Sequence, residues 1–186
     1  FYRFYSARPE APDMYLVVDL SAGPNATNYP ISYLNAIPPN GWTDEYKTTK
    51  LVLRRIPAGT FTMGAPVAEL GRESYETQHQ VTITKDYYLG VLEVTQKQWE
   101  RVVGNWPSLF NNTTHRESRP VERVSYYDIR ENPANTDDMT VDWPNNIVVN
   151  TDSFIGKLRA KTGLFTLDLP TESQWEYACR SGTASS

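Results

Sequence analysis

The sequence offers a single thiol, at Cys179, as its first candidate for chemistry. A cysteine acts as a nucleophile when a nearby cation or histidine lowers its pKa and when solvent can reach it. Trp175 and Ala178 precede Cys179 at the spacing of one helical face, which predicts a small, buried and unreactive residue. A lone cysteine can form neither an internal disulfide nor a cysteine-rich metal site.

Two histidines, His79 and His115, are the imidazoles available for metal binding or acid–base catalysis. An iron site of two histidines and one carboxylate needs three convergent ligands, typically with two of them close in sequence. His79 opens a strand-like run, whereas His115 lies in a polar loop, and no spacing pairs them. The sequence therefore predicts two exposed or hydrogen-bonded histidines and no metal site.

Five carboxylates complete the set of candidates. Asp137, Asp138 and Asp142 lie in a long polar insertion, but they lack the glycine and the distal glutamate of a calcium loop, which favours a solvated acidic loop. Glu172 and Glu176 lie one helical turn apart and could serve acid–base catalysis, although capping and ion pairing explain them better. We predict no catalytic, cofactor-binding or metal-binding residue in this chain.

Length and composition set the class of protein. The chain has 186 residues, of which 39% are hydrophobic and 22% charged, as in a globular domain with a core. The net charge of −4 disfavours nucleic acid as a partner, and no run approaches the roughly 20 apolar residues of a membrane span. Twelve tyrosines and five tryptophans either fill an irregular core or form a surface that binds sugar or peptide.

The segment from Leu169 to Thr183 (LPTESQWEYACRSGT) predicts a helix with a marked start and end. Thr171 suits the N-cap, and Gln174 three residues later completes a capping box. Trp175, Ala178 and Cys179 form a predicted buried apolar stripe in the same segment. Glu176 and Arg180 are spaced for an ion pair, and Gly182 is the expected end of the helix.

Three earlier segments also begin with helix caps. Thr95 is followed by Gln98 in a second capping box. Ser125 is expected to cap a third helix together with Asp128, and either Asp152 or Ser153 starts a further helix. The helix after Thr95 has an apolar stripe of Trp99, Val102 and Val103 and is expected to end at Gly104. The last of the three has a stripe of Phe154, Ile155 and Leu158 and is expected to end at Gly163.

Short strand-like runs alternate with loops between these helices. The expected strands are Phe1–Ser6, Met14–Leu20, Lys50–Ile56, Thr60–Met63, His79–Thr84 and Tyr87–Val94. Because Pro57-Ala58-Gly59 forms a turn signal, we expect residues 50–56 and 60–63 to pair as a hairpin. The order of elements is not a βαβ alternation, so the predicted class is α+β with much irregular structure.

Four blocks of the chain resemble the formylglycine-generating enzyme family, also called sulfatase-modifying factors. The blocks are IPAGTFTMG from Ile56, YYLGVLEVTQKQWERVVG from Tyr87, RPVERVSYYD from Arg119 and the closing LPTESQWEYACRSGT. The resemblance covers roughly Thr49 to the C-terminus and implies a C-type-lectin-like fold. We therefore expect residues 1–48 to be a linker and the end strand of an upstream region, and residues 49–186 to be the N-terminal half of the family's domain.

The resemblance implies an oxidase that converts a cysteine in a sulfatase peptide into formylglycine with oxygen and copper. In that family two cysteines of the C-terminal half hold the copper, and calcium sites lie mostly in that half as well. Neither cysteine motif occurs here, so we predict that this chain alone is inactive. The resemblance also implies that Cys179 can form a structural disulfide with the second half.

Two alternatives remain beside the oxidase. One is a non-catalytic ligand-binding module of the same fold in a larger extracellular protein, and such extracellular bacterial relatives favour an extracytoplasmic or secreted location. The other is the sulfoxide-synthase branch of the family, which uses non-haem iron. In each case we expect the faces of Trp175–Cys179 and Trp99–Val103 to need further chain to cover them, which predicts a poorly cooperative thermal transition.

Overall fold

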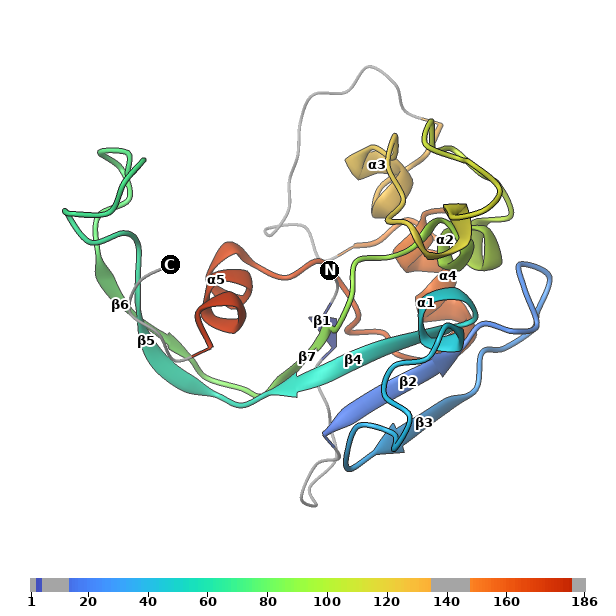
Figure 1. Ribbon diagram of the computed structural model, residues 1–186, viewed down its shortest axis with the longest axis horizontal. Coiled ribbons are helices and arrows are strands. Elements are labelled where there is room, and N and C mark those ends of the chain that lie inside the picture. Colours follow the sequence, from blue (N-terminus) through green and yellow to red (C-terminus); the bar gives the residue numbers. More distant parts are fainter. Residues whose placement is uncertain (1–2, 5–13, 135–147, 182–186) are drawn as a thin grey trace.

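A computed structural model describes residues 3–4, 14–134 and 148–181. Its centre is a five-stranded antiparallel sheet with the order β1-β7-β4-β2-β3 (Figure 1). The strands are β1 (Arg3–Phe4), β2 (Tyr15–Asp19), β3 (Ile31–Leu34), β4 (Lys50–Ile56) and β7 (Tyr87–Gly90). In the centre of this sheet Leu16 of β2 lies opposite Leu53 of β4, so both side chains face the same layer of helices.

A second sheet of two strands, β5 (Gly59–Met63) and β6 (His79–Ile83), projects from the first as an arm (Figure 1). The expected hairpin of residues 50–56 with 60–63 is therefore wrong, because β4 pairs with β2 and β7 whereas β5 pairs with β6. At Pro57-Ala58 the chain bends without reversing. Asp86 holds this bend, since its carboxylate accepts the Ala58 N–H at 2.7 Å and pairs with Arg55.

Four of the five α-helices in the described residues begin where the sequence predicted, and the first was not predicted. They are α1 (Glu45–Thr48), α2 (Gln96–Val103), α3 (Tyr126–Ile129), α4 (Phe154–Thr162) and α5 (Glu172–Arg180), with a 3-10 turn at Arg116–Ser118. Thr95, Ser125 and Thr171 each form a capping box, and Ser153 caps α4. Gly104 and Gly163 end their helices with φ of +94° and +73°, whereas α5 ends at Ser181 and not at the expected Gly182, which lies outside the described residues.

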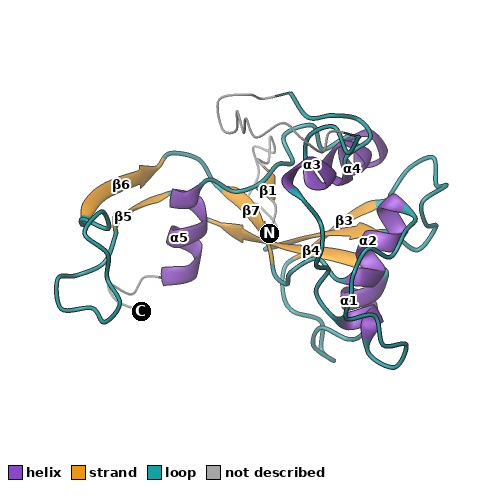
Figure 2. Cartoon of the chain, turned by 90° about the horizontal axis from the view of Figure 1, so that it is seen from above, coloured by secondary structure: helices purple, strands orange, loops and turns teal. Residues whose placement is uncertain are grey.

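Helices α2 and α4 cover one face of the larger sheet and build the main core. Trp99 of α2 stacks on Phe154 of α4 with ring centroids 4.9 Å apart. Trp99 and Val102 are 3% and 1% exposed, so the expectation that this face needs further chain to cover it is wrong. Figure 2 shows these helices gathered with α1 and α3 around the larger sheet, while α5 lies apart beside the arm.

The described part of residues 1–48 does not form the linker that we expected. Strand β2 lies between β4 and β3, and Leu16, Val18, Leu20 and Tyr29 all belong to the main core. Strand β1 pairs with β7 of the same sheet, so it is an edge of this domain and not of an upstream one. Physically, β4 needs a neighbour on each side to satisfy its backbone groups, and β2 supplies one.

A buried ion cluster fixes the approach of the chain to α5. Arg130, which is 0% exposed, donates to both carboxylate oxygens of Asp168 at 2.8 and 3.2 Å. Asp168 also accepts from Arg159 at 3.1 Å, and Arg130 donates to Glu131 at 2.6 Å. Burial alone would lower the pKa of Arg130, but the hydrogen bond to Asp168 and the negative charge of Asp168, together with Tyr126 and Glu131, raise it. The cluster ties the end of α3 to α4 and to the strand-like segment before α5.

Candidate functional site

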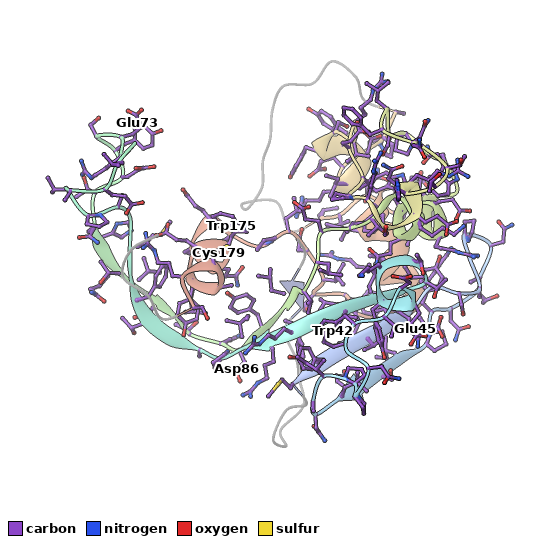
Figure 3. The ribbon with its side chains drawn as sticks, viewed as in Figure 1. Trp42, Glu45, Glu73, Asp86, Trp175 and Cys179 are labelled. Carbon is purple, nitrogen blue, oxygen red and sulfur yellow. The ribbon has the colours of Figure 1, made fainter. Side chains whose placement is uncertain are left out.

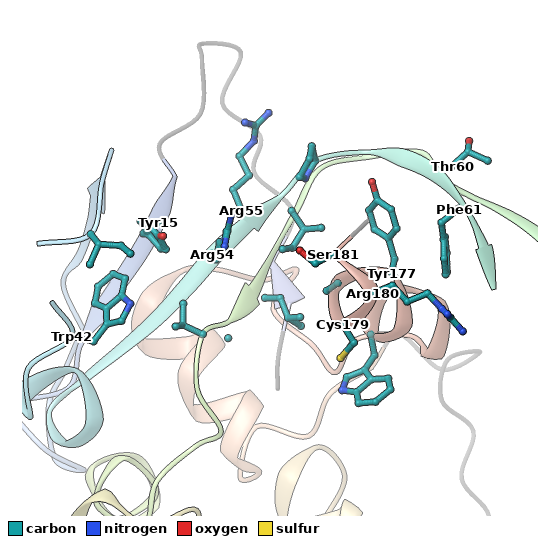
Figure 4. A pocket seen from close by; sticks show the side chains of 18 of the residues that line it. Tyr15, Trp42, Arg54, Arg55, Thr60, Phe61, Tyr177, Cys179, Arg180 and Ser181 are labelled. Carbon is teal, nitrogen blue, oxygen red and sulfur yellow. The ribbon is translucent and has the colours of Figure 1, made fainter. Parts of the chain in front are cut away.

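A groove with a volume of about 820 Å³ runs between the larger sheet, β5 and α5 (Figure 4). Figure 4 shows Trp42 on one side, Arg54 and Arg55 in the middle, and Tyr177 and Cys179 of α5 on the other side. Its lining is aromatic, aliphatic and cationic: Tyr15, Ile37, Trp42, Arg54, Arg55, Ile56, Pro57, Thr60, Phe61, Thr62, Leu89, Gly90, Val91, Trp175, Tyr177, Ala178, Cys179, Arg180 and Ser181.

Helix α5 lies in the groove with Trp175 and Cys179 of its predicted apolar stripe exposed, whereas Ala178, the third member, packs against the buried cluster of Ile83, Tyr87 and Leu89. Trp175 is 46% exposed and Cys179 is an exposed free thiol, so the prediction that they are buried is wrong. The face that packs instead contains Gln174, whose carbonyl accepts from Tyr87 Oη at 2.6 Å, and Tyr177, which meets Phe61 at a centroid distance of 5.1 Å. Figure 3 places Trp175 and Cys179 between the arm and the larger sheet.

A closed set of polar contacts joins α5 to the end of β5. Glu176 and Arg180 form the predicted ion pair, with Nε and Oε1 2.7 Å apart. Gly64 donates its backbone N–H to Glu176 at 2.8 Å, and its carbonyl accepts from Arg180 at 2.7 Å. Glu176 is therefore an anchor of the helix, and Glu172 is an exposed residue of its first turn.

The three arginines that line the groove differ in their partners. Arg55 pairs with Asp86, and Arg180 pairs with Glu176. The pKa of Asp86 is lowered first by the hydrogen bond from the Ala58 N–H and then by Arg55, although burial opposes both effects. The side chain of Arg54 is exposed, and within the described residues it makes no ion pair. Arg54 is thus the cation of the groove with charge left for a ligand.

The aromatic side of the groove is held rigid by its neighbours. Trp42 makes edge contacts with Tyr15 and with Tyr46, each at a centroid distance of 5.0 Å. A ring fixed on two sides loses little conformational freedom when a ligand packs on it. Neither Trp42 nor Arg54 was singled out from the sequence, because only the folded chain brings the loop before α1, strand β4 and helix α5 around one groove. The high aromatic content was the signal that pointed to such a surface.

Comparison with known proteins places the chain in a family. Residues 43–186 match the family described as sulfatase-modifying factor enzyme 1-like domain. The chain belongs to the sulfatase-modifying factor family. A relative in Paenibacillus barcinonensis, named chaperone protein LppX, is 38% identical over 125 residues, which are 61% of this chain and 42% of the relative. The match therefore spans less than half of that relative's length, and no solved structure matches the chain.

The copper chemistry implied by the sulfatase-modifying factor family does not fit the residues of this chain. Two thiolates are implied as ligands, and the sequence has Cys179 alone. Within the residues that the structure describes, no three side chains among His, Cys, Asp and Glu come together as a metal site. His79 lies on β6 and contacts the Thr77 carbonyl at 2.9 Å, whereas His115 precedes the 3-10 turn without a capping hydrogen bond from its side chain. We therefore derive no step through a metal.

The remaining expectations concern the acidic loop, a disulfide of Cys179 and a membrane span. Asp137, Asp138 and Asp142, considered for calcium, lie outside the described residues, so the acidic-loop interpretation stays a prediction. The disulfide of Cys179 with further chain also stays a prediction. None of the helices in the described part of the chain has the length and apolar character needed to cross a bilayer.

Proposed function

We propose that this chain is a polypeptide-binding part of a sulfatase-modifying factor protein, with the groove beside α5 as its binding surface. The observation that carries this proposal is the exposure of Trp175 on a helix whose opposite face is packed and anchored. Large exposed aromatic side chains beside a groove are typical of surfaces that bind protein segments. The name of the relative, a chaperone, agrees with such a role.

Peptide binding by the full chain tests this proposal. A fluorescein-labelled extended peptide that contains leucine and phenylalanine is titrated with the protein, and fluorescence anisotropy reports binding. Trp175→Ala should weaken binding, and because this side chain is exposed the variant should keep its fold. The matched control is Leu70→Ala, since Leu70 is fully exposed on the arm and does not line the groove. Equal affinities for Trp175→Ala and the unaltered chain would count against the groove.

A second candidate function is favoured by membership of the family. In the intact protein, the family relationship favours oxidation of a cysteine in a sulfatase peptide to formylglycine, with copper and oxygen. We propose that the cysteines for that chemistry belong to the second half of the domain, since Cys179 stands alone here.

The chain alone is accordingly expected to leave a sulfatase-type cysteine peptide unchanged. Mass spectrometry after aerobic incubation with copper measures this directly, with an active family member as the positive control. Formation of formylglycine would refute our expectation that this chain alone is inactive.

A further inference from the structure

The groove is cationic although the chain as a whole is acidic. Among the described residues that line it, the charged ones are Arg54, Arg55 and Arg180 and none is Asp or Glu, whereas the net charge of the chain is −4. Charged residues of one sign that gather in a cleft raise the local concentration of ligands of the opposite sign. The groove therefore favours an anionic ligand.

The register of the sheet places Arg54 in the middle of the groove. Arg54 of β4 lies opposite Tyr15 of β2 and opposite Leu89 of β7, so the three side chains share one face of the sheet. Tyr15 and Leu89 are buried, so apolar residues flank Arg54 on both neighbouring strands. A guanidinium binds a carboxylate with two parallel hydrogen bonds, and these charge-assisted bonds are stronger than neutral ones.

The amount of free charge limits what the groove can bind. Arg55 and Arg180 are already paired with Asp86 and Glu176, so among the described lining residues about one positive charge, that of Arg54, remains for a ligand. A nucleic acid or another polyanion would bring many charges to one free cation and would be repelled by the net negative chain. A polypeptide with a single carboxylate between apolar side chains matches the lining better.

We propose that the groove binds an extended segment of a partner protein that carries an Asp or Glu flanked by apolar side chains. The carboxylate pairs with Arg54, and the apolar side chains pack on Trp42 and Trp175. This inference rests on the proposed polypeptide-binding function and adds the chemical class of the partner and the residue that selects it. Trp42, fixed by Tyr15 and Tyr46, provides a preformed contact for one flanking side chain.

The test uses the full chain and two labelled peptides that differ only by a central glutamate or glutamine between leucines. We expect the glutamate peptide to bind about tenfold more tightly, as a hydrogen bond to a charged group predicts. Arg54→Gln should remove this preference and leave affinity for the glutamine peptide unchanged. The matched control is Arg123→Gln, because Arg123 is an exposed arginine outside the groove, and it should retain the preference.

The outcomes separate this inference from the function on which it rests. Trp175→Ala should lower the affinity for both peptides by the same factor, since it removes an apolar contact but no charge. Equal binding of the two peptides, or a preference that survives Arg54→Gln, would overturn the inference and leave polypeptide binding intact. Failure of both peptides to bind would overturn both proposals. A heparin fragment serves as an unlabelled competitor. If it displaces the labelled glutamate peptide more effectively than the unlabelled glutamate peptide does, the groove selects polyanions, contrary to the inference.

Discussion

Replacement of Asp168 by asparagine should strongly destabilise the fold. The Asp168 side chain is 8% exposed and the Arg130 side chain 0%, so solvent cannot compensate for a lost partner. The substitution removes the charge that faces Arg130 Nε at 2.8 Å and Nη2 at 3.2 Å, and it also weakens the contact with Arg159. Loss of one partner of a buried pair costs about 3–5 kcal/mol. That is a large part of the roughly 5–15 kcal/mol by which a domain is stable.

Urea denaturation followed by tryptophan fluorescence measures this loss. Glu131→Gln is the matched control, because Glu131 also contacts Arg130 but its side chain is 23% exposed, and its loss should cost less than about 1 kcal/mol. An Arg130→Met, Asp168→Leu double variant should recover much of the stability, since both charges of the most deeply buried pair are then removed together. Our reasoning fails if Asp168→Asn lies within about 1 kcal/mol of the unaltered chain at an unchanged denaturant slope.

Two further predictions concern packing and pH. Gly59→Ala should lower stability by about 1–3 kcal/mol in urea unfolding, because its Cβ would lie 2.3 Å from the Tyr177 hydroxyl oxygen; a Tyr177→Phe background should relieve most of this, and no relief would contradict the clash. Burial raises the pKa of Tyr29 to about 12, while the nearby Arg101 opposes the rise. As the pH rises, the unfolded chain therefore loses the Tyr29 proton before the folded chain does. The free energy of unfolding should be constant below pH of about 10 and fall between about 10 and 12, by up to about 1.4 kcal/mol per pH unit. A Tyr29→Phe variant whose free energy of unfolding falls equally steeply over this range would refute the assignment.

Local hydrogen bonding made several elements predictable from the sequence. The capping boxes at Thr95 and Thr171 each join residues three apart, so the chemistry that starts these helices is contained within one turn. The same holds for the Glu176–Arg180 pair, which lies one turn apart and forms as predicted. Such contacts depend little on the rest of the fold.

Partners distant in sequence explain what could not be predicted. Arg130 and Asp168 are 38 residues apart, and their pairing depends on the position of α3 relative to the segment before α5. The pairing of β4 with β2 and not with β5 depends likewise on the bend that Asp86 holds from 28 residues away. No local pattern encodes these distances. The groove has the same origin, because its two sides come from the first and last parts of the chain.

Helix α5 has some features that the sequence predicted and others that only the tertiary structure set. The sequence by itself determined where this helix starts, its ion pair and the family to which the chain belongs. Only the tertiary structure decided which face is buried: Gln174 meets β7 of the larger sheet, Tyr177 meets the arm, and Trp175 and Cys179 remain exposed. The physical reason is that an apolar stripe states which residues gain from burial, whereas the surface that a helix meets is set by the strands and polar contacts that anchor it.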